Sequence, residues 1–198
     1  GLDFFKEAVR LQKEIAPTGL RVTNVIQTNG TTLTPAWCRF FKDHGFLVGL
    51  SLDGPPEMHN AFRRDRAGHG TFNQALRAVN LLKGQEVDFN ILCCVHRGNQ
   101  DHPLSVYQFF RDSLAVEFIQ FIPILQRKLD QHVRETDEIT SLSVQSDAYG
   151  RFLINIFDEW VQRDVGRVFV QIFDLALGAW LGAPPGLCVF AETCGRAL

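Results

Sequence analysis

The chain has 198 residues, of which 45% are hydrophobic and 21% are charged, and its formal net charge is -2. This is the composition of an ordinary soluble globular protein with one sizeable core, and the near-neutral charge gives no basis for binding nucleic acid or an anionic membrane. The charged, amphipathic amino terminus is neither a signal nor a transit peptide, and no uncharged run could span a membrane. We therefore expect a cytoplasmic protein that binds neither nucleic acid nor a membrane.

The first third of the chain alternates between helical and strand-like segments. Apolar residues at helical spacing predict a helix over residues 2–15, and a β-rich run follows over residues 21–27. Residues 34–44 have a Thr-Pro start that is typical of a helix amino terminus, and Gly45 fits the position just after its end. Residues 46–52 are almost continuously apolar, as in a buried parallel strand.

The middle of the chain continues this alternation after a long connection. Residues 53–70 are rich in Gly, Pro and Arg and are longer than a plain connection needs, which predicts a functional lid or a mobile excursion. Thr71 caps the next helix, whose inner stripe is Leu76, Val79 and Leu82. A strand over residues 87–95, a helix over 104–111 and a strand over 116–125 complete this part.

The last third of the chain changes in character. Residues 126–146 are polar with little periodicity and predict a surface loop or insertion, whereas residues 149–162 have the pattern of a strong amphipathic helix. Residues 167–173 are strand-like, and residues 174–181 form a short apolar helix. We place a domain boundary between residues 165 and 166.

Three strands end in polar turns, at residues 27–30, 51–55 and 96–99. Parallel strands joined by helices present their carboxyl ends on one side, and ligands of such sheets bind there. Gln27 and Asn29 offer amides, although Asn-Gly is also a common plain turn. Ser51 and Asp53 lie two residues apart on an extended backbone, which suits ribose hydroxyls or an amino group, or simply a capped turn.

The long loop and the third turn are basic. Their cationic side chains could bind a carboxylate or a phosphate, but a solvated surface is the commoner role of such residues. They are His59, Arg63, Arg64, Arg66, His96 and Arg97.

The five cysteines are an odd number in a chain without a secretory signal, so they do not predict a disulfide framework. Cys38, Cys93 and Cys94 fall within apolar segments and are expected to be small buried hydrophobic residues. Cys188 and Cys194 follow a Pro-Pro-Gly turn in an irregular segment and could be half of an iron–sulfur or zinc site, which needs about four ligands.

The strand count limits the architecture. A closed (β/α)8 barrel needs eight strands and about 200–250 residues. Only four strands alternate with helices here, and the chain opens with a helix that has no strand before it. We expect a partial barrel that is truncated at both ends.

Six stretches, in order along the chain, resemble the anaerobic sulfatase-maturating enzymes, which are radical S-adenosylmethionine enzymes with a carboxyl-terminal SPASM domain. They are residues 1–5, 26–30, 50–55, 118–123, 149–160 and 169–194. The resemblance implies an α/β fold in which residues 1–165 are a truncated parallel-sheet partial barrel of radical SAM type. Residues 166–198 would then begin the SPASM region.

The resemblance also implies a reaction. Members of the family use S-adenosyl-L-methionine and 4Fe-4S clusters, with an electron donor such as flavodoxin or ferredoxin, to oxidise a Cys or Ser of a sulfatase polypeptide to formylglycine. Their CxxxCxxC and Gly-Gly-Glu-Pro motifs are absent from this sequence. We therefore expect an oxidoreductase activity of the parent protein that this chain alone does not perform, and no catalytic residue within it.

Several residues match positions that bind the cofactor in this family. Ser51 matches a polar contact to S-adenosylmethionine, and Ile124 matches a residue against the adenine. Asn29, Gln27 and Asp53 line the same rim and are expected to touch the cofactor or the substrate peptide.

The resemblance also implies a role for two cysteines near the carboxyl end of the sequence. Cys188 and Cys194 match the first two ligands of the first auxiliary cluster in this family. Two other interpretations stay open: another peptide-modifying radical SAM enzyme with a SPASM domain, and a non-enzymatic module that binds a peptide or a metal. A cofactor-free aldolase would need a lysine at a strand end, and none of the five lysines falls there.

Overall fold

A computed structural model describes residues 1–129, 135–184, 186–187 and 190–191. Its centre is a five-stranded sheet in the order β1-β2-β3-β4-β7, and every neighbouring pair in it is parallel. This confirms the α/β class and the parallel sheet that the sequence predicts. The strands are β1 (Asn24–Thr28), β2 (Phe46–Ser51), β3 (Phe89–Val95), β4 (Phe118–Pro123) and β7 (Phe169–Val170).

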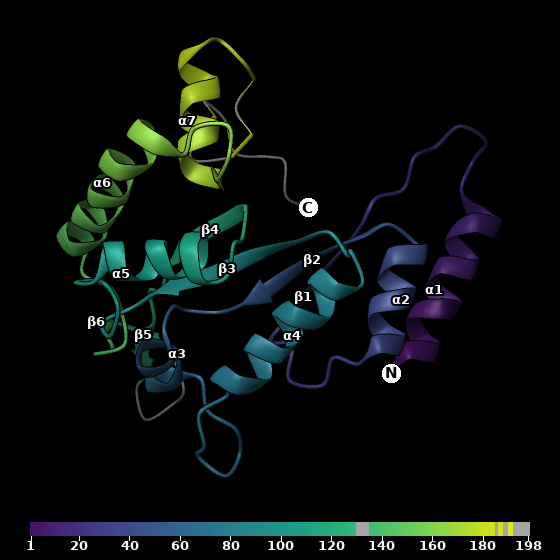
Figure 1. The fold of residues 1–198 in the computed structure, drawn as a ribbon, viewed down its shortest axis with the longest axis horizontal. Helices are drawn as coiled ribbons and strands as arrows, with labels where there is room; N and C mark the ends of the chain where they lie inside the picture. The colour runs from purple at the N-terminus through teal and green to yellow at the C-terminus, as the bar shows by residue number, and fades with distance from the viewer. Residues whose placement is uncertain (130–134, 185, 188–189, 192–198) are drawn as a thin grey trace.

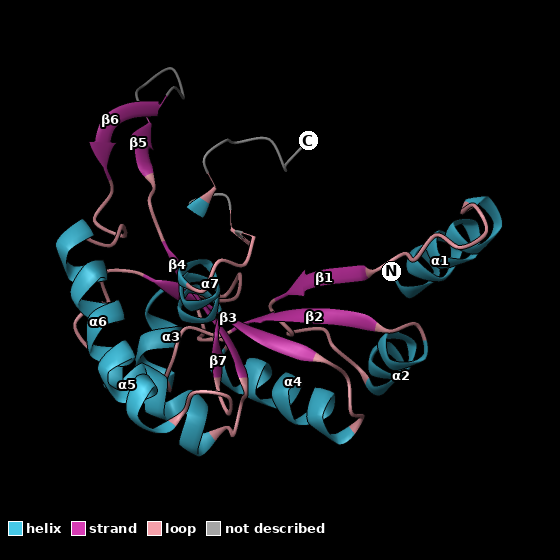
Figure 2. Cartoon of the chain, turned by 90° about the horizontal axis from the view of Figure 1, so that it is seen from above, coloured by secondary structure: helices cyan, strands magenta, loops and turns pink. Residues whose placement is uncertain are grey.

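Helices cover the outer face of this sheet, which curves like part of a barrel wall (Figure 2). Helix α1 packs on α2 at one end of the molecule, where the rings of Phe5 and Trp37 meet edge to face at 5.4 Å, and α6 lies at the other end (Figure 1). The helices are α1 (Leu2–Ile15), α2 (Pro35–Asp43), α3 (Pro56–Phe62), α4 (Phe72–Gly84), α5 (Pro103–Gln108) with the π-helix η1 (Phe109–Ser113), α6 (Ser146–Arg163) and α7 (Gln171–Trp180).

The hydrophobic core lies between the sheet and these helices. Alternate strand residues such as Val48, Leu50 and Ile91 are fully buried on the outer face of the sheet, because successive side chains of a strand point to opposite faces. On the opposite, inner face, Phe118 and Ile122 remain exposed. The described residues therefore leave the concave inner face of the sheet largely open.

The connection over residues 53–70, for which the sequence predicts a functional lid or a mobile excursion, contains regular structure. It contains α3, which starts with Pro56 at its first turn, and a short antiparallel bridge between Arg64 and Gly70. Proline fits this helix position because its missing N–H would have no partner there. The Pro-Pro pair is therefore a helix start.

The polar stretch over residues 126–146 also has more structure than predicted. It contains a two-stranded antiparallel ribbon of β5 (Arg127–Leu129) and β6 (Glu135–Ile139). Such short, polar strands carry too few apolar residues to give a periodic signal.

The strand predicted over residues 167–173 is only two residues long, because α7 already begins at Gln171. Val168, Val170 and Phe173 join the main core, and β7 pairs with β4. Strand β7 thus belongs to the same sheet as β1 to β4, and the domain boundary before residue 166 stays a prediction. No helix in the described part of the chain has the length and apolar character needed to cross a membrane.

Candidate functional site

The carboxyl ends of the parallel strands meet at one edge of the sheet. Ser51 is the last residue of β2, Asn29 follows the last residue of β1, and Ile124 follows β4. The Ile124 N–H donates to the carbonyl of Val95, the last residue of β3, at 2.9 Å. The common rim that the sequence predicts is therefore present, and we call it the carboxyl edge.

The first turn of the carboxyl edge combines a structural role with free polar groups. The Asn29 side-chain oxygen accepts bonds from the N–H (3.2 Å) and the hydroxyl (2.9 Å) of Thr31, so the plain-turn interpretation is correct for this oxygen. Gln27 and Asn29 are both exposed. Within the described residues nothing accepts a bond from either amide NH2 group, so both remain available to a ligand.

Ser51 and Ile124 lie at the same edge with different environments. Ser51 is half-buried on the inner face of β2, and its hydroxyl has no hydrogen bond within the described residues. The half-buried Ile124 accepts a backbone bond from Val144 at 3.0 Å, which fixes its main chain. A free hydroxyl and an apolar side chain on one edge suit a ligand with a polar and an aromatic part.

Asp53, which the sequence places on this edge as a possible ligand contact, is buried and bonded within the protein. Only 2% of its surface is exposed. Its carboxylate accepts two bonds from Arg63, at 2.5 Å from Nε and 3.0 Å from the terminal nitrogen, and one from the backbone N–H of Cys94 at 2.9 Å. A carboxylate that is this fully engaged within the protein holds the edge together, and Arg63 is not a solvated loop residue.

Two histidines complete this buried group. His59 Nδ1 accepts a bond from the Asp53 N–H at 3.3 Å, and its Nε2 faces the Thr71 hydroxyl at 3.2 Å. His96 is fully buried, and its Nδ1 accepts a bond from the Gly98 N–H at 3.0 Å. We call Asp53, His59, Arg63, Cys94, His96 and Asn99 the Asp53 cluster.

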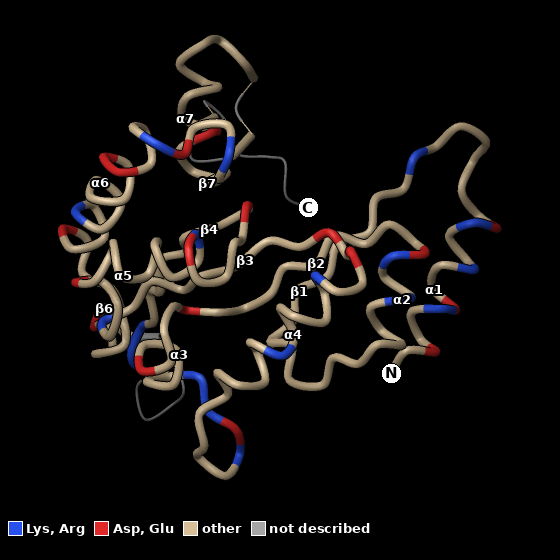
Figure 3. Tube along the Cα trace, in the orientation of Figure 1, with Lys and Arg blue, Asp and Glu red and all other residues tan. Residues whose placement is uncertain are grey.

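Asn99 is a member that the sequence did not single out as a structural residue. Its side-chain NH2 donates to the carbonyls of Asp53 (3.0 Å) and Cys94 (2.9 Å), while its oxygen accepts from the His96 N–H at 2.8 Å. The only local signal is its place in a Gly-Asn turn. The basic residues that follow Arg63 are exposed, and Figure 3 shows both signs of charge along that projecting loop.

Because His59 is buried, we expect the stability of the protein to depend on pH. Removal from water disfavours the imidazolium, and this lowers the pKa of His59 from 6.5 to about 4. The unfolded chain therefore binds more protons between these values, so stability should fall by up to about 3 kcal/mol as the pH drops from about 6.5 to 4. We expect the His59→Gln variant to lose this part of the pH dependence of its unfolding free energy, measured by urea titration. Exposed His69 is the control, and equal slopes in His59→Gln and His69→Gln would contradict the assignment.

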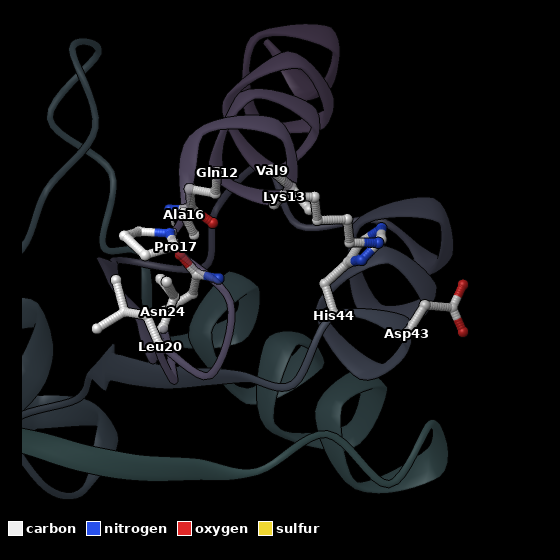
Figure 4. Close-up of a pocket in the computed structure, with 10 residues that line it drawn as sticks. Val9, Gln12, Lys13, Ala16, Pro17, Leu20, Asn24, Asp43 and His44 are labelled. Carbon is white, nitrogen blue, oxygen red and sulfur yellow. Dashed lines mark hydrogen bonds between the residues drawn. The ribbon is translucent and has the colours of Figure 1, made fainter.

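Two cavities lie away from the carboxyl edge. One of about 810 Å³ is bounded by the starts of β2, β3, β4 and β7 and by α7, with Phe118 and Phe169 in its wall. The other, of about 450 Å³, lies between α1 and α2 and includes Asn24, the first residue of β1 (Figure 4). Both are at the amino ends of strands, where ligands of parallel sheets do not normally bind.

The described residues do not contain a metal centre. No group of three or more His, Cys, Asp or Glu side chains in that part of the chain is arranged to hold a metal ion. The predicted ligands Cys188 and Cys194 lie outside the described residues. Cys38 and Cys93 are buried and Cys94 is half-buried, so the prediction of small buried residues is confirmed for the first two.

The sequence pattern of the Radical SAM superfamily matches residues 1–110, more than half of the chain. The chain belongs to the radical SAM superfamily. Among solved radical SAM structures, one described as native anSMEcpe with bound AdoMet and Cp18Cys peptide matches 98% of the chain with a TM-score of 0.82 and 34% identity. The match covers 52% of that structure.

Named relatives of this radical SAM chain agree with the predicted resemblance. A serine-type anaerobic sulfatase-maturating enzyme of Bacteroides thetaiotaomicron is 41% identical over 99% of the chain and 49% of the relative. A cysteine-type enzyme of Clostridium perfringens is 35% identical over 98% of the chain and 51% of the relative. The chain thus spans about half the length of the curated relatives it matches.

Proposed function

We propose that the protein is a sulfatase-maturating radical SAM enzyme, which oxidises a serine or cysteine of a sulfatase polypeptide to formylglycine. The observation that carries this proposal is the match, over 98% of the chain, to a structure that binds AdoMet and a peptide. The names of relatives at 41% and 35% identity support the same reaction and leave the choice between serine and cysteine open.

The carboxyl edge fits S-adenosylmethionine. The free hydroxyl of Ser51 can bond the polar part of the ligand, and Ile124 can pack against the adenine. Gln27 and Asn29 supply amides on the same edge for the cofactor or the substrate peptide. With a reduced 4Fe-4S cluster, the bound cofactor would supply a deoxyadenosyl radical that takes a hydrogen atom from the β-carbon of the target residue.

The described residues hold no ligand set for a cluster, so we assign them no step that involves one. We propose that Cys188 and Cys194 are ligands of an auxiliary cluster within a SPASM region, and that an electron donor such as flavodoxin or ferredoxin reduces the protein in the cytoplasm. The inner face of the sheet next to the carboxyl edge, with exposed Ile122, is the surface that we assign to the peptide.

The activity is tested by anaerobic incubation of the reconstituted, reduced protein with S-adenosylmethionine and sulfatase peptides that carry serine or cysteine at the target position. Mass spectrometry should detect 5′-deoxyadenosine and formylglycine. Cleavage of the cofactor without change to either peptide would indicate another peptide-modifying radical SAM enzyme. Failure to cleave the cofactor would contradict the proposal.

The Ser51 hydroxyl gives a sharper test of the site. Ser51→Ala should weaken S-adenosylmethionine binding about tenfold, because it removes one hydrogen bond to a bound ligand. The control is Ser113→Ala, an exposed serine at the end of η1 on the opposite edge of the sheet. Calorimetric titration of the two variants measures this difference, and equal affinities would exclude Ser51 from the site.

A further inference from the structure

Every polar group of Asp53 is hydrogen-bonded to another residue of the protein. Its N–H donates to His59, its carbonyl accepts from Asn99, and its carboxylate binds Arg63 and the Cys94 N–H. These partners come from α3, from the segment that follows α3, from β3 and from the turn after β3. One residue therefore joins the end of β2 to four other parts of the chain.

The bonds of Asp53 also restrict the position of Ser51, because only one residue separates the two. Ser51 lies two residues before Asp53, and the intervening Leu52 is fully buried, with its N–H donating to the Leu92 carbonyl at 3.2 Å. The segment is thus fixed to β3 by its middle residue and by the Asp53 carboxylate. Ser51 itself keeps a hydroxyl without a partner among the described residues.

Arg63 is the cation that completes the anchoring. Its side chain is 24% exposed, and its planar fork holds both oxygens of Asp53 while one nitrogen lies 3.3 Å from the Cys94 sulfur. Paired bonds of this kind restrict the orientation of both side chains more than a single bond does. Lysine cannot reproduce this geometry, because its ammonium is a single point charge.

His96 lies beside the Asp53–Arg63 pair as a neutral imidazole. Because its Nδ1 accepts a bond from the Gly98 N–H, its proton lies on Nε2. That Nε2 is buried, has no hydrogen-bond partner among the described residues, and lies 4.0 Å from the nearer Asp53 oxygen. Arg63 is therefore the cation that is bonded to Asp53, and its loss would leave the carboxylate without a charged donor.

We propose that the Asp53–Arg63 ion pair is a positioning unit, which fixes the backbone of residues 51–53 so that the Ser51 hydroxyl is held in place for S-adenosylmethionine. The assignment to this ligand rests on the proposed function. Neither residue of the pair needs to touch the cofactor. Their effect on binding is transmitted through Ser51.

The test combines Ser51→Ala with Asp53→Asn in a double-mutant cycle. Asp53→Asn keeps the size of the side chain but removes its charge, and it should weaken S-adenosylmethionine binding about tenfold, as Ser51→Ala does. If the carboxylate acts through the serine, the double variant should bind about tenfold and not about a hundredfold more weakly than the wild type. Independent losses that multiply would overturn the proposal.

Hydrogen exchange gives a readout that does not require the ligand. In Asp53→Asn the backbone amides of Leu52, Asp53 and Cys94 should exchange about tenfold faster, whereas amides in α6 should not change. If exchange is unchanged, the positioning unit is refuted whatever the ligand is. If exchange accelerates but the wild-type protein does not bind S-adenosylmethionine, the proposed function has failed and the assignment of this ligand is overturned with it.

Three further variants separate the effect of the charge from general disruption of the fold. Asp65→Asn is the matched control, because Asp65 is an exposed aspartate of the neighbouring loop that bonds only within that loop. It should change neither affinity nor exchange. Arg63→Gln should weaken S-adenosylmethionine binding, and Arg63→Lys should recover less than half of that loss in affinity. Wild-type affinity in Arg63→Lys would show that the fork geometry is unimportant.

Discussion

Replacing Gly30 with alanine should lower the free energy of unfolding by about 3 kcal/mol. Gly30 has a φ of +73°, which costs an L-residue about 1–2 kcal/mol. An added Cβ would also lie 2.5 Å from the Cβ of Ala78 in α4 and 2.8 Å from Cδ1 of Leu50 in β2, and such overpacking costs about 1–3 kcal/mol more. The same close approach places Asn29 at the carboxyl edge.

Gly45→Ala is the control for this substitution, and urea unfolding is the measurement. Gly45 has a φ of +60°, but an added Cβ there meets no atom within 4 Å. This variant should lose only about 1 kcal/mol, which is the backbone contribution. Equal losses in the two variants would show that the turn is not packed against α4 as described.

Replacing Trp160 with alanine should cost about 4 kcal/mol of unfolding free energy. The side chain is 1% exposed, and its ring packs against Phe157 and Phe173 at centroid distances of 5.8 Å and 5.4 Å. Its indole N–H donates to the carbonyl of Val168 at 2.7 Å. Truncation leaves both a large cavity and a buried carbonyl that has lost its indole donor, so the cost lies within the usual range of about 3–5 kcal/mol.

Trp180→Ala provides the matched control, because Trp180 is 91% exposed at the end of α7. Its stability should stay within about 0.5 kcal/mol of the wild type in the same urea titration. Trp160→Phe should fall between the two variants, since it keeps an aromatic ring but not the donor. Similar losses in Trp160→Ala and Trp180→Ala would contradict the packing of α6 against Phe173 of α7 and Val168.

The parallel sheet could be predicted because its signal is local. Residues 46–52 are a nearly continuous apolar run and residues 87–95 are mostly apolar, as is typical of parallel strands, and the helices between them have regular spacing. The short strand Phe169–Val170 was overestimated in length, because α7 begins with the apolar residues that follow it.

The carboxyl edge was only partly predictable for a different reason. The strand end locates Ser51 from the sequence and the family resemblance locates Ile124, whereas the role of Asp53 depends on partners up to 46 positions away. A lone Asp-Gly turn looks the same in sequence whether its carboxylate faces a ligand or an arginine. Composition suggested a solvated loop for Arg63, and only the fold shows that its charge turns inward to Asp53.

A crystal structure of the protein with S-adenosylmethionine, prepared without oxygen, tests the central claim most directly. We expect the ligand to lie at the carboxyl edge, with a polar atom within hydrogen-bond distance of the Ser51 hydroxyl and the adenine against Ile124. A ligand seated instead in the cavity beside Phe118 and Phe169, at the amino ends of the strands, would contradict it.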